Sequence, residues 1–365
     1  MNELVSQNKE SYNKIAGLFS QTRSFIWEDL KALKQYVQTG DSVLDVGCGN
    51  GRLLEVFKSS QTKYLGVDFS EGLIAEARKK YPDEEFQVVD VMDLDSMNKK
   101  FDVVFCVSVL NHFPKEMHEV AIKKIKSVLN PGGRLLMVNW DLWNLKRKKS
   151  VWRQNTAVKY KLLATGFKDV MTTWKSGKTQ ADLYYYAFTK REIKKLVEGN
   201  GFKIIKNYYS KAGKQACWLC GDNLVTVAQL TFDELEKKPS KIQGNGTFAK
   251  KKFEKGDEVY KIPMHEIRYE NFKRYAYVGN GQYVNDEDVL NYVNHSCAPN
   301  IVLDIERPDP VLIAVKDIYP GEELVCNYDL TEVKGVYRKC NCGDKNCKGF
   351  FGRSKDFKSK ICKCK

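Results

Sequence analysis

Hydrophobic and polar positions follow two different periods along this chain, and the change between them lies near residue 230. Residues 1–40 carry apolar side chains at the three- and four-residue spacing of amphipathic helices. From residue 42 onward, short apolar runs alternate with amphipathic stretches, which predicts strands at 42–46, 64–67, 86–89, 101–107 and 134–138 and helices at 52–58, 72–80 and 115–129. Strands that alternate with helices over short connections predict an α/β domain with a doubly wound, mostly parallel sheet.

Three later stretches depart from this alternation. A helix at 189–198 and strands at 202–208 and 224–227 predict an antiparallel hairpin that closes the sheet. Residues 141–180 are basic and interleaved with tryptophan, and we interpret them as an insertion over the sheet edge. From residue 241 the chain favours short strands and glycine-rich turns, which predicts a mostly-β domain. The expected parts of the chain are 1–229, 230–334, a cysteine-rich segment 335–352 and a basic tail 353–365.

Length and charge narrow the choice of partners. The chain has 365 residues and a formal net charge of +14, so it is long enough for two cores and favours polyanions or acidic surfaces. The alternative interpretation of that charge is a lysine-rich surface that only aids solubility. No apolar run reaches the roughly 20 residues needed to span a bilayer, and the N-terminus lacks the apolar core of a signal peptide. We therefore expect a cytoplasmic protein without a membrane span.

A glycine-rich turn, Asp45-Val46-Gly47-Cys48-Gly49-Asn50-Gly51, follows the first predicted strand. Glycines at a strand-to-helix junction allow positive φ and close approach of a ligand, and a helix N-terminus favours an anionic group such as a carboxylate. Asp68 ends the second predicted strand, where a carboxylate can accept hydrogen bonds from ribose hydroxyls. The G-x-G-x-G spacing differs from the G-x-G-x-x-G of NAD sites.

This turn resembles the D-x-G-x-G-x-G motif of class I S-adenosylmethionine (SAM) methyltransferases. The resemblance implies an α/β Rossmann-like domain with a SAM site, in which Asp90 and Val91 flank the adenine and Ser108 and Val109 line the pocket. The full set of implied cofactor-binding residues is Asp45, Gly47, Gly49, Gly51, Asp68, Asp90, Val91 and Ser108.

A narrower resemblance comes from three further segments: Tyr12-x2-Ile15-Ala16-x2-Phe19-x2-Thr22-Arg23-x3-Trp27, Val109-Leu110-Asn111-His112-Phe113 and Tyr184-Tyr185-Tyr186-Ala187-Phe188-Thr189. With the glycine turn they resemble the tRNA wobble-uridine carboxymethyl methyltransferases over roughly residues 10–228. The resemblance implies that Arg23 and His112 face the methyl acceptor. A guanidinium fork suits a carboxylate, which is already a nucleophile. This chain has Asn111-His112 in place of a His-His-type pair, and the alternative role for His112 is to cap the helix expected near Lys115.

The basic stretch 141–180 suits an RNA clamp, in which Lys146, Arg147, Lys148 and Lys149 hold phosphates and tryptophans stack on bases. The alternative is a solvated helical face with its tryptophans packed inward, and a small molecule or lipid is the competing acceptor. The resemblance to tRNA enzymes also implies a small activating subunit as a partner of the first domain.

The second half holds an ordered series of motifs: Gly244-Asn245-Gly246-Thr247-Phe248, Asn294-His295-Ser296-Cys297, Gly321-Glu322-Glu323-Leu324 with Tyr328-Asp329, and Cys340-x-Cys342-x4-Cys347. The series resembles SET-domain protein-lysine methyltransferases with a post-SET zinc segment. The resemblance implies that Gly244, Gly246, Asn294 and His295 contact a second SAM and that Tyr328 is the catalytic tyrosine. Tyr292 and Tyr283 are the candidate walls of a lysine channel, whose burial would lower the pKa of the substrate amine.

Cys326 lies two residues before Tyr328, where this family often has Phe or Tyr. That position influences how many methyl groups are added. We therefore expect a roomier channel and loose control of the degree of methylation.

The chain has 11 cysteines, an odd number that indicates buried thiols, metal ligands or reactive thiols before it indicates disulfides in a reducing compartment. Cys48 and Cys106 lie in apolar contexts and are expected in the core. The SET resemblance implies a structural Zn²⁺ site with four thiolate ligands, Cys297, Cys340, Cys342 and Cys347. The remaining pairs are either a second zinc site or incidental: Cys217-x2-Cys220 and Cys362-x-Cys364.

Together these patterns predict a bifunctional SAM-dependent methyltransferase with two SAM sites and one zinc ion. The SET domain is expected to methylate protein lysine, and the first domain tRNA or a small acidic acceptor. In the alternatives only one half is catalytic, and the other is a protein-binding or RNA-binding module.

Overall fold

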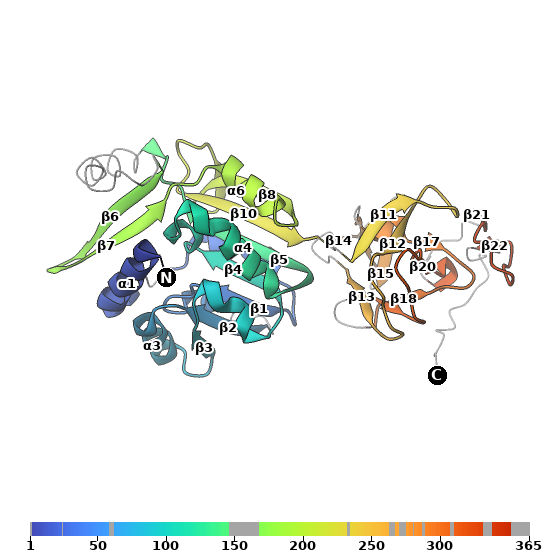
Figure 1. The fold of residues 1–365 in the computed structure, drawn as a ribbon, viewed down its shortest axis with the longest axis horizontal. Helices are drawn as coiled ribbons and strands as arrows, with labels where there is room; N and C mark the ends of the chain where they lie inside the picture. Colours follow the sequence, from blue (N-terminus) through green and yellow to red (C-terminus); the bar gives the residue numbers. More distant parts are fainter. Residues whose placement is uncertain are drawn as a thin grey trace. The chain divides into compact units, whose positions relative to one another are not determined.

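The chain forms two compact units, Met1–Thr231 and Phe232–Lys365 (Figure 1). The computed structural model describes residues 2–23, 25–57, 62–145, 168–231, 234–262, 267–269, 275–279, 281–286, 289–306, 310–330 and 338–351. Within these ranges, no helix combines the length and the apolar character needed to cross a membrane.

The first unit is built on one eight-stranded sheet with the order β3-β2-β1-β4-β5-β10-β8-β9. The first five strands along the chain pair with one another in parallel: β1 (Ser42–Val46), β2 (Lys63–Asp68), β3 (Glu85–Val88), β4 (Phe101–Val107) and β5 (Leu129–Trp140). The remaining strands are antiparallel: β8 (Phe202–Lys211), β9 (Lys214–Ala216) and β10 (Asn223–Leu230), which lies between β5 and β8. This arrangement confirms the predicted parallel sheet closed by an antiparallel hairpin.

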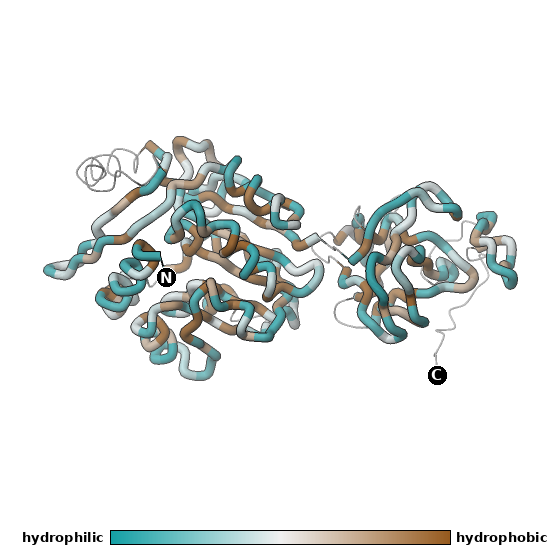
Figure 2. Tube along the Cα trace, viewed as in Figure 1, coloured by the Kyte–Doolittle hydropathy of each residue, from teal (hydrophilic) through white to brown (hydrophobic). Residues whose placement is uncertain are grey.

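Alternate residues of β1 face two different hydrophobic layers, because successive side chains of a strand point to opposite sides. Leu44 and Val46 belong to one buried cluster with Ile122 of α4, and Val43 belongs to the other with Leu30 of α2. In Figure 2 the central strands, such as β4 and β10, are mostly brown, whereas α1 is mostly teal. Burial on both faces is the usual condition for a parallel sheet.

Among the residues that the structure describes, the α-helices of the first unit are α1 (Glu3–Thr22), α2 (Glu28–Leu33), α3 (Glu71–Lys80), α4 (His118–Ser127) and α6 (Lys190–Glu198). The helix predicted at 52–58 is present as a 3₁₀ helix over Arg52–Val56 (η2), and Lys58 lies outside the described residues. Gly51 precedes it with a φ of 73°, and the amide of Leu54 donates to the Gly51 carbonyl three residues back. The helix predicted from 115 likewise begins as a 3₁₀ turn, Lys115–Met117, and becomes α-helical only at His118.

The strand β5 begins at Leu129, earlier than the predicted start at Arg134. The segment Asn130-Pro131-Gly132-Gly133 follows the end of α4, as predicted, but it lies within the strand. Gly132 has a φ of 71°, and the pairing with β4 shifts register between Phe101 and Val103. The glycine pair therefore makes an irregular strand start rather than a loop.

A long hairpin lies where the sequence predicted only a basic insertion. It consists of β6 (Asp169–Ser176) and β7 (Thr179–Tyr186), paired from Asp169↔Tyr186 to Ser176↔Thr179. Figure 1 shows α1 beside this hairpin. The Asn8 side chain donates to the Tyr184 carbonyl (3.1 Å) and accepts from the Tyr184 amide (2.8 Å), which fixes α1 against β7.

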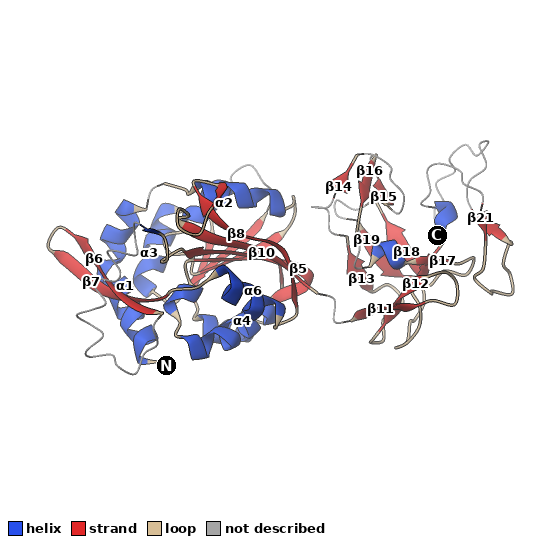
Figure 3. Ribbon diagram, turned by 90° about the horizontal axis from the view of Figure 1, so that it is seen from above, coloured by secondary structure: helices blue, strands red, loops and turns tan. Residues whose placement is uncertain are grey.

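The second unit consists of short strands in small sheets, as predicted for a mostly-β domain (Figure 3). Its core includes Val259, Val284, Val293, Ile301 and Leu324. The strands are β11 (Leu235–Pro239), β12 (Asn245–Ala249), β13 (Glu258–Lys261), β14 (Ile267–Arg268), β15 (Ala276–Gly279), β16 (Gln282–Val284), β17 (Asn294–His295), β18 (Ile301–Asp304), β19 (Val311–Ala314), β20 (Val325–Cys326), β21 (Arg338–Lys339) and β22 (Phe350–Phe351).

Candidate active sites

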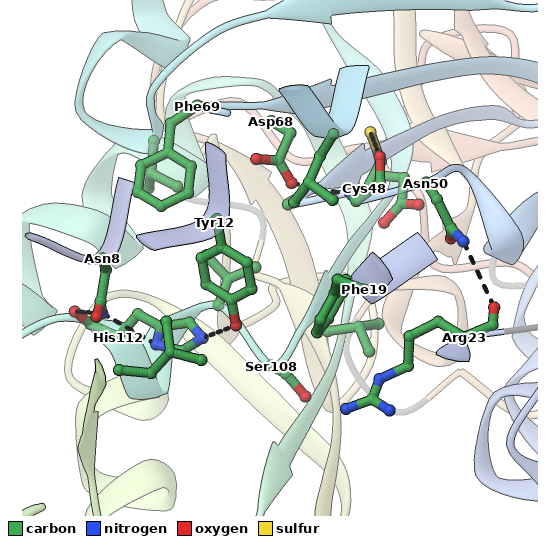
Figure 4. A pocket seen from close by; sticks show the side chains of 18 of the residues that line it. Asn8, Tyr12, Phe19, Arg23, Cys48, Asn50, Asp68, Phe69, Ser108 and His112 are labelled. Atoms are coloured by element: carbon green, nitrogen blue, oxygen red, sulfur yellow. Dashed lines mark hydrogen bonds between the residues drawn. The ribbon is translucent and has the colours of Figure 1, made fainter. Parts of the chain in front are cut away.

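A cavity of about 310 Å³ opens at the carboxyl ends of β1, β2 and β4 in the first unit (Figure 4). The carboxyl edge of a doubly wound sheet is where such folds bind ligands. All but one of the residues predicted for this site line the cavity: Arg23, Asp45, Gly47, Gly49, Asp68, Asp90, Val91, Ser108 and His112. The exception is Gly51, where a Cβ atom would lie 2.8 Å from the Phe86 ring, so its demonstrable role is close packing.

The glycine turn adopts a backbone that other residues rarely adopt. The φ angles of Gly47, Gly49 and Gly51 are 71°, 57° and 73°. A Cβ atom at Gly47 would also lie 2.1 Å from Cγ2 of Val109. The amide of Gly49 donates to Asp68 Oδ2 at 2.9 Å, so the turn and the second acidic residue are locked together.

Two buried carboxyl groups form the floor of the cavity. The Tyr64 hydroxyl donates to Asp45 Oδ2 at 2.8 Å, and the Ser70 amide donates to Asp68 Oδ1 at 2.9 Å. Burial raises the pKa of Asp45 to about 7 and that of Asp68 to about 6. A ligand with hydroxyl or ammonium donors would compensate the cost of ionising them, and SAM carries both.

The imidazole of His112 is held from both sides. Because the Tyr184 carbonyl can only accept, Nδ1 of His112 carries the hydrogen that joins them at 2.8 Å. Nε2 then accepts from the Tyr12 hydroxyl at 3.0 Å. Burial lowers the pKa of His112 to about 4. The alternative role as a helix cap is wrong, since α4 begins at His118 after Met117, with no side-chain cap.

Asn111 links two strands rather than facing the cavity. Its Nδ2 donates to the Tyr186 carbonyl at 3.0 Å, and its Oδ1 accepts from the Trp140 amide at 3.3 Å. The side chain is fully buried and joins β7 to β5. Asn111 therefore supports the pocket wall behind His112.

The outer half of the cavity is aromatic, and most of its residues had no predicted role. Tyr12 and Phe19 come from α1, Trp174 from β6 and Tyr185 from β7. The rings of Trp140 and Tyr185 stack at 5.3 Å with an angle of 10°. The usable sequence signals were the helical spacing of Tyr12 and Phe19 within their motif and the Tyr184–Thr189 segment that contains Tyr185.

Arg23 follows α1 at the mouth of this aromatic half, and its guanidinium lies 4.8 Å from the Phe19 ring centroid. Ser108 has a φ of 57°, and its buried hydroxyl has no hydrogen-bond partner among the residues that the structure describes. Figure 4 shows both side chains at the cavity. The site therefore offers a cation and an unused hydroxyl to a polar acceptor.

The cations of the predicted RNA clamp, Lys146, Arg147, Lys148 and Lys149, lie outside the described residues. Two tryptophans of the 141–180 stretch are described, and both pack inward. The Trp143 indole donates to the Ala187 carbonyl at 3.0 Å, and the Trp174 ring lies 6.4 Å from Phe19. These two side chains follow the inward-packed alternative.

In the second unit, two segments far apart in sequence pair as parallel strands. Asn294 and His295 of β17 pair with Val325 and Cys326 of β20. The amide of Ser296 extends the pairing by donating to the Cys326 carbonyl at 2.9 Å. This parallel pairing brings Asn294 and His295 against the segment that leads to Tyr328.

Glu323, which had no predicted role, joins the predicted cofactor residues of this unit. Its Oε1 accepts from Asn294 Nδ2 at 2.7 Å, and its Oε2 accepts from the Ser240 hydroxyl at 2.9 Å. Asn294 Nδ2 also donates to the Asn245 carbonyl at 3.1 Å. A Cβ atom at Gly246 would lie 2.2 Å from Glu323 Oε1, so this glycine makes room for the carboxylate.

Gly244 has a φ of 53°, and a Cβ atom at this position would have nothing within 4 Å. Its carbonyl accepts from the Ser240 amide at 2.8 Å, which closes the β11–β12 turn. The predicted glycine turn is therefore held at one end by Ser240 and at the other by Glu323.

Tyr328 lies next to the paired strands β17 and β20. Its amide donates to His295 Nδ1 at 3.1 Å, and its hydroxyl donates to the Val293 carbonyl at 2.6 Å. The Phe351 ring of β22 stacks on His295 at 4.2 Å and meets Tyr328 edge-on at 5.5 Å. Cys326 is buried beside them.

Tyr292 and Tyr283, the two tyrosines predicted as channel walls, each lie against another side chain. Lys237 Nζ lies 4.2 Å from the Tyr292 ring centroid. Tyr283 of β16 packs on Tyr277 at 5.4 Å. Their part in a lysine channel stays a prediction.

Four cysteines of the second unit converge: the thiol sulfurs of Cys297, Cys340, Cys342 and Cys347 lie within 4.8 Å of one another. Cys297 Sγ is 3.9 Å from the sulfurs of Cys340 and Cys347. Four thiolates at this separation fit a closed tetrahedral zinc site. Among the other thiols, Cys48 and Cys106 are buried as predicted, and Cys217 and Cys220 are exposed. Cys362 and Cys364 lie outside the described residues.

Comparison with known families gives two matches. The methyltransferase domain family matches residues 43–133, and the SET domain family matches residues 168–329. The second match begins inside the first unit, where residues 168–231 supply β6 to β10. The strands that carry the SET motifs themselves all follow Thr231.

Curated relatives of the first unit include the following three. The probable tRNA methyltransferase 9B of Bos taurus is 32% identical over 36% of this chain and 28% of its own length. The tRNA (carboxymethyluridine(34)-5-O)-methyltransferase of Saccharomyces cerevisiae is 35% identical over 36% of this chain and 47% of its own length. A putative methyltransferase of Encephalitozoon cuniculi is 28% identical over 53% of this chain and 86% of its own length. The chain thus spans less than half the length of the first two relatives.

Proposed function

The chain combines a class I methyltransferase domain with a SET domain, and we propose that it is a bifunctional SAM-dependent methyltransferase. The first unit methylates a carboxylate, on tRNA or on a small acidic molecule, and the second methylates protein lysine. We place the enzyme in the cytoplasm, with a small activating subunit as a partner of the first unit.

The observation that carries the first activity is the cavity that connects the glycine turn to Arg23. SAM, when bound, supplies an electrophilic methyl group. Gly47 and Gly49 let the backbone approach that ligand, and Asp45 and Asp68 accept hydrogen bonds from it. At the other end, Arg23 orients the acceptor carboxylate with its guanidinium fork.

The state of His112 supports an acceptor that arrives ionised. Its Nε2 already accepts from the Tyr12 hydroxyl, and burial lowers its pKa to about 4. A general base works best when its pKa is close to the operating pH, so His112 is poorly suited to deprotonate an amine or a hydroxyl. We therefore assign it to positioning Tyr12, and a carboxylate needs no base.

Two of the relatives are named tRNA methyltransferases, and the formal net charge of +14 favours a polyanion. Both facts support tRNA over a small acid. Label transfer from SAM into total cell extract, sorted into RNA, protein and small molecules, tests the choice. Label only in small molecules would reject tRNA.

Arg23 offers a sharper test of the carboxylate. Arg23→Lys keeps the charge but removes the bidentate fork, so we expect KM for the acceptor to rise about tenfold while SAM affinity is unchanged. Arg23→Gln should raise it further. An unchanged KM in both variants would contradict the assigned role.

The second activity is supported by the parallel pairing of β17 with β20 and by the hydrogen bond from the Tyr328 amide to His295 Nδ1. Tyr328 interacts with the lysine amine and orients its lone pair, and the four-thiolate zinc site holds the segment that carries Phe351 over His295. Tyr328→Phe should abolish transfer to protein while SAM still binds.

The alternative is that only one unit is catalytic. Calorimetry with SAM on the intact chain separates the two hypotheses, because the bifunctional enzyme binds two molecules per chain. A single bound molecule would reject it, and Gly47→Ala and Glu323→Gln would then identify the unit that binds.

A further inference from the structure

The turn Cys217–Gly221, between β9 and β10, carries two thiols that neither proposed active site uses. Both are exposed, unlike Cys48, Cys106 and Cys326, which are buried. The amides of Cys220 and Gly221 both donate to the Cys217 carbonyl, at 3.1 and 2.9 Å, and close the turn. A turn closed between residues i and i+3 holds their Cα atoms within about 7 Å of each other, which is close to the separation that a disulfide spans.

The two thiols are chemically unequal. The neighbouring Cys220 thiol, together with the nearby backbone N–H groups of Leu219 and Cys220, lowers the pKa of Cys217. The neighbouring Cys217 thiol raises the pKa of Cys220. Cys217 is therefore the more readily ionised sulfur and Cys220 the one that keeps its proton, which is the asymmetry of C-x-x-C exchange motifs.

The turn is also anchored. The Leu145 amide donates to the Leu219 carbonyl at 3.0 Å, and the Asn144 side chain donates to the Gly221 carbonyl at 2.7 Å. On the other side, the Asp222 amide donates to the Ser210 carbonyl at 2.7 Å. A fixed backbone keeps the second thiol close to the first, which favours an intramolecular disulfide over a lasting mixed disulfide.

We propose that Cys217 and Cys220 form a thiol–disulfide exchange site for small disulfides of the glutathione type. The Cys217 thiolate attacks one sulfur of the small disulfide, forms a mixed disulfide and releases one thiolate. Cys220 then loses its proton and attacks Cys217 Sγ, which closes the protein disulfide and releases the second small thiol. The protein loses two electrons and two protons, and the small disulfide gains them.

A metal site is the competing use of such a pair. Among the residues that the structure describes, the only group of three or more ligands suited to a metal is the one at Cys297, Cys340, Cys342 and Cys347. At the Cys217 turn, the described residues supply two thiolates, whereas a closed zinc site needs four. Exchange needs only the two sulfurs that are present.

The test uses the full chain with zinc bound, incubated with oxidised glutathione and mapped by mass spectrometry under non-reducing conditions. We expect the peptide with both cysteines to lose two hydrogen atoms, while the buried Cys48 and Cys106 stay reduced. Cys220→Ser should trap glutathione on Cys217. Cys217→Ser should leave Cys220 at least about tenfold slower to react, because its thiol is less ionised.

Equal reaction rates of the two single variants would overturn the proposal, as would glutathione on both cysteines of the intact chain without a disulfide. Zinc analysis provides the third outcome. A zinc ion bound beyond the Cys297 site, and lost in both Cys217→Ser and Cys220→Ser, would identify a metal site and reject exchange.

Discussion

The two proposed SAM sites of this chain orient backbone groups toward a ligand in different ways. In the first unit, glycines at the end of one parallel strand take positive φ, and a single pair of neighbouring strands brings Gly49 to Asp68. In the second unit, side chains do this work, since Glu323 ties Asn294 to the β11–β12 turn. The first site lies at one sheet edge. The second forms only when β17 and β20, which are distant in sequence, have paired.

This difference separates two kinds of vulnerability. The first site depends on backbone space at a few glycines, so it should fail when a methyl group is added. The second depends on hydrogen bonds and on the thiol cluster that holds its last segment, so it should fail when a polar partner or a metal is removed. Matched substitutions in the two units test whether the two sites depend on these different features.

The largest expected effect is loss of the thiol cluster. Cys347→Ser leaves three thiolates, and structural zinc sites contribute roughly 10–16 kcal/mol in small peptides. We expect the zinc to be lost and lysine transfer to stop, with carboxylate methylation by the first unit unchanged. Metal analysis and label transfer measure both, with the exposed Cys217→Ser as control. Lysine transfer by a zinc-free variant would show that the second site does not depend on the thiol cluster.

Gly47→Ala should have the next largest effect, confined to the first unit. The new methyl group would meet Val109 at 2.1 Å at a φ of 71°, which we expect to destabilise the unit by about 3 kcal/mol and abolish its SAM binding. Gly49→Ala is the matched control, because nothing lies within 4 Å of its Cβ position. It should cost only about 1 kcal/mol. Equal destabilisation, measured by denaturant titration without SAM, would show that space is not the cause.

Asp45→Asn should stabilise the SAM-free first unit while it weakens SAM binding. Burial raises the pKa of Asp45 from its ordinary value of 3.8 to about 7, so its contribution to folding is present below pH 4 and is lost as pH rises through 7. The variant should therefore gain little near pH 4 and about 4 kcal/mol at pH 7.5. Denaturant titrations at both values measure the gain, and a gain independent of pH would show that burial of the charge is not its source.

Glu323→Gln should have the smallest effect, confined to the second unit. The amide keeps the size of the side chain but cannot accept from both Asn294 and Ser240, so we expect SAM affinity there to fall about tenfold. Glu322→Gln is the control, because Glu322 is exposed and its carboxylate accepts from the Tyr319 amide at 3.2 Å rather than from Asn294. An equal loss in both variants would show that Glu323 does not position the turn.

Sequence patterns predicted the elements better than the contacts between them. The parallel sheet follows from apolar runs such as 42–46 and 101–107, whose burial on both faces leaves a local signal. The local signal of the hairpin β6–β7 is weaker, because its exposed lysines and its single tryptophan obscured the alternation within a basic stretch. Its partner α1 is fixed by Asn8 and Tyr184, residues too far apart in sequence for any period to relate them.

The same limit applies to the sites. The three glycines and the trio Cys340, Cys342 and Cys347 could be found because their chemistry depends on short spacing. Cys297 lies 43 positions before Cys340, and only the resemblance to SET domains joined it to the trio. The roles of Tyr12 beside His112 and of Glu323 beside Asn294 depend on tertiary contacts, and each side chain has many other uses in a core or on a surface. Only the folded arrangement distinguishes them.

The parallel pairing of β17 with β20 has a consequence for how the chain is made. Asn294 and His295 leave the ribosome before their partners Val325 and Cys326 have been synthesised. The second unit therefore cannot complete this pairing while the polypeptide is still short, whereas the sheet of the first unit is complete once Leu230 has emerged. Translation would thus allow the first unit to fold well before the second.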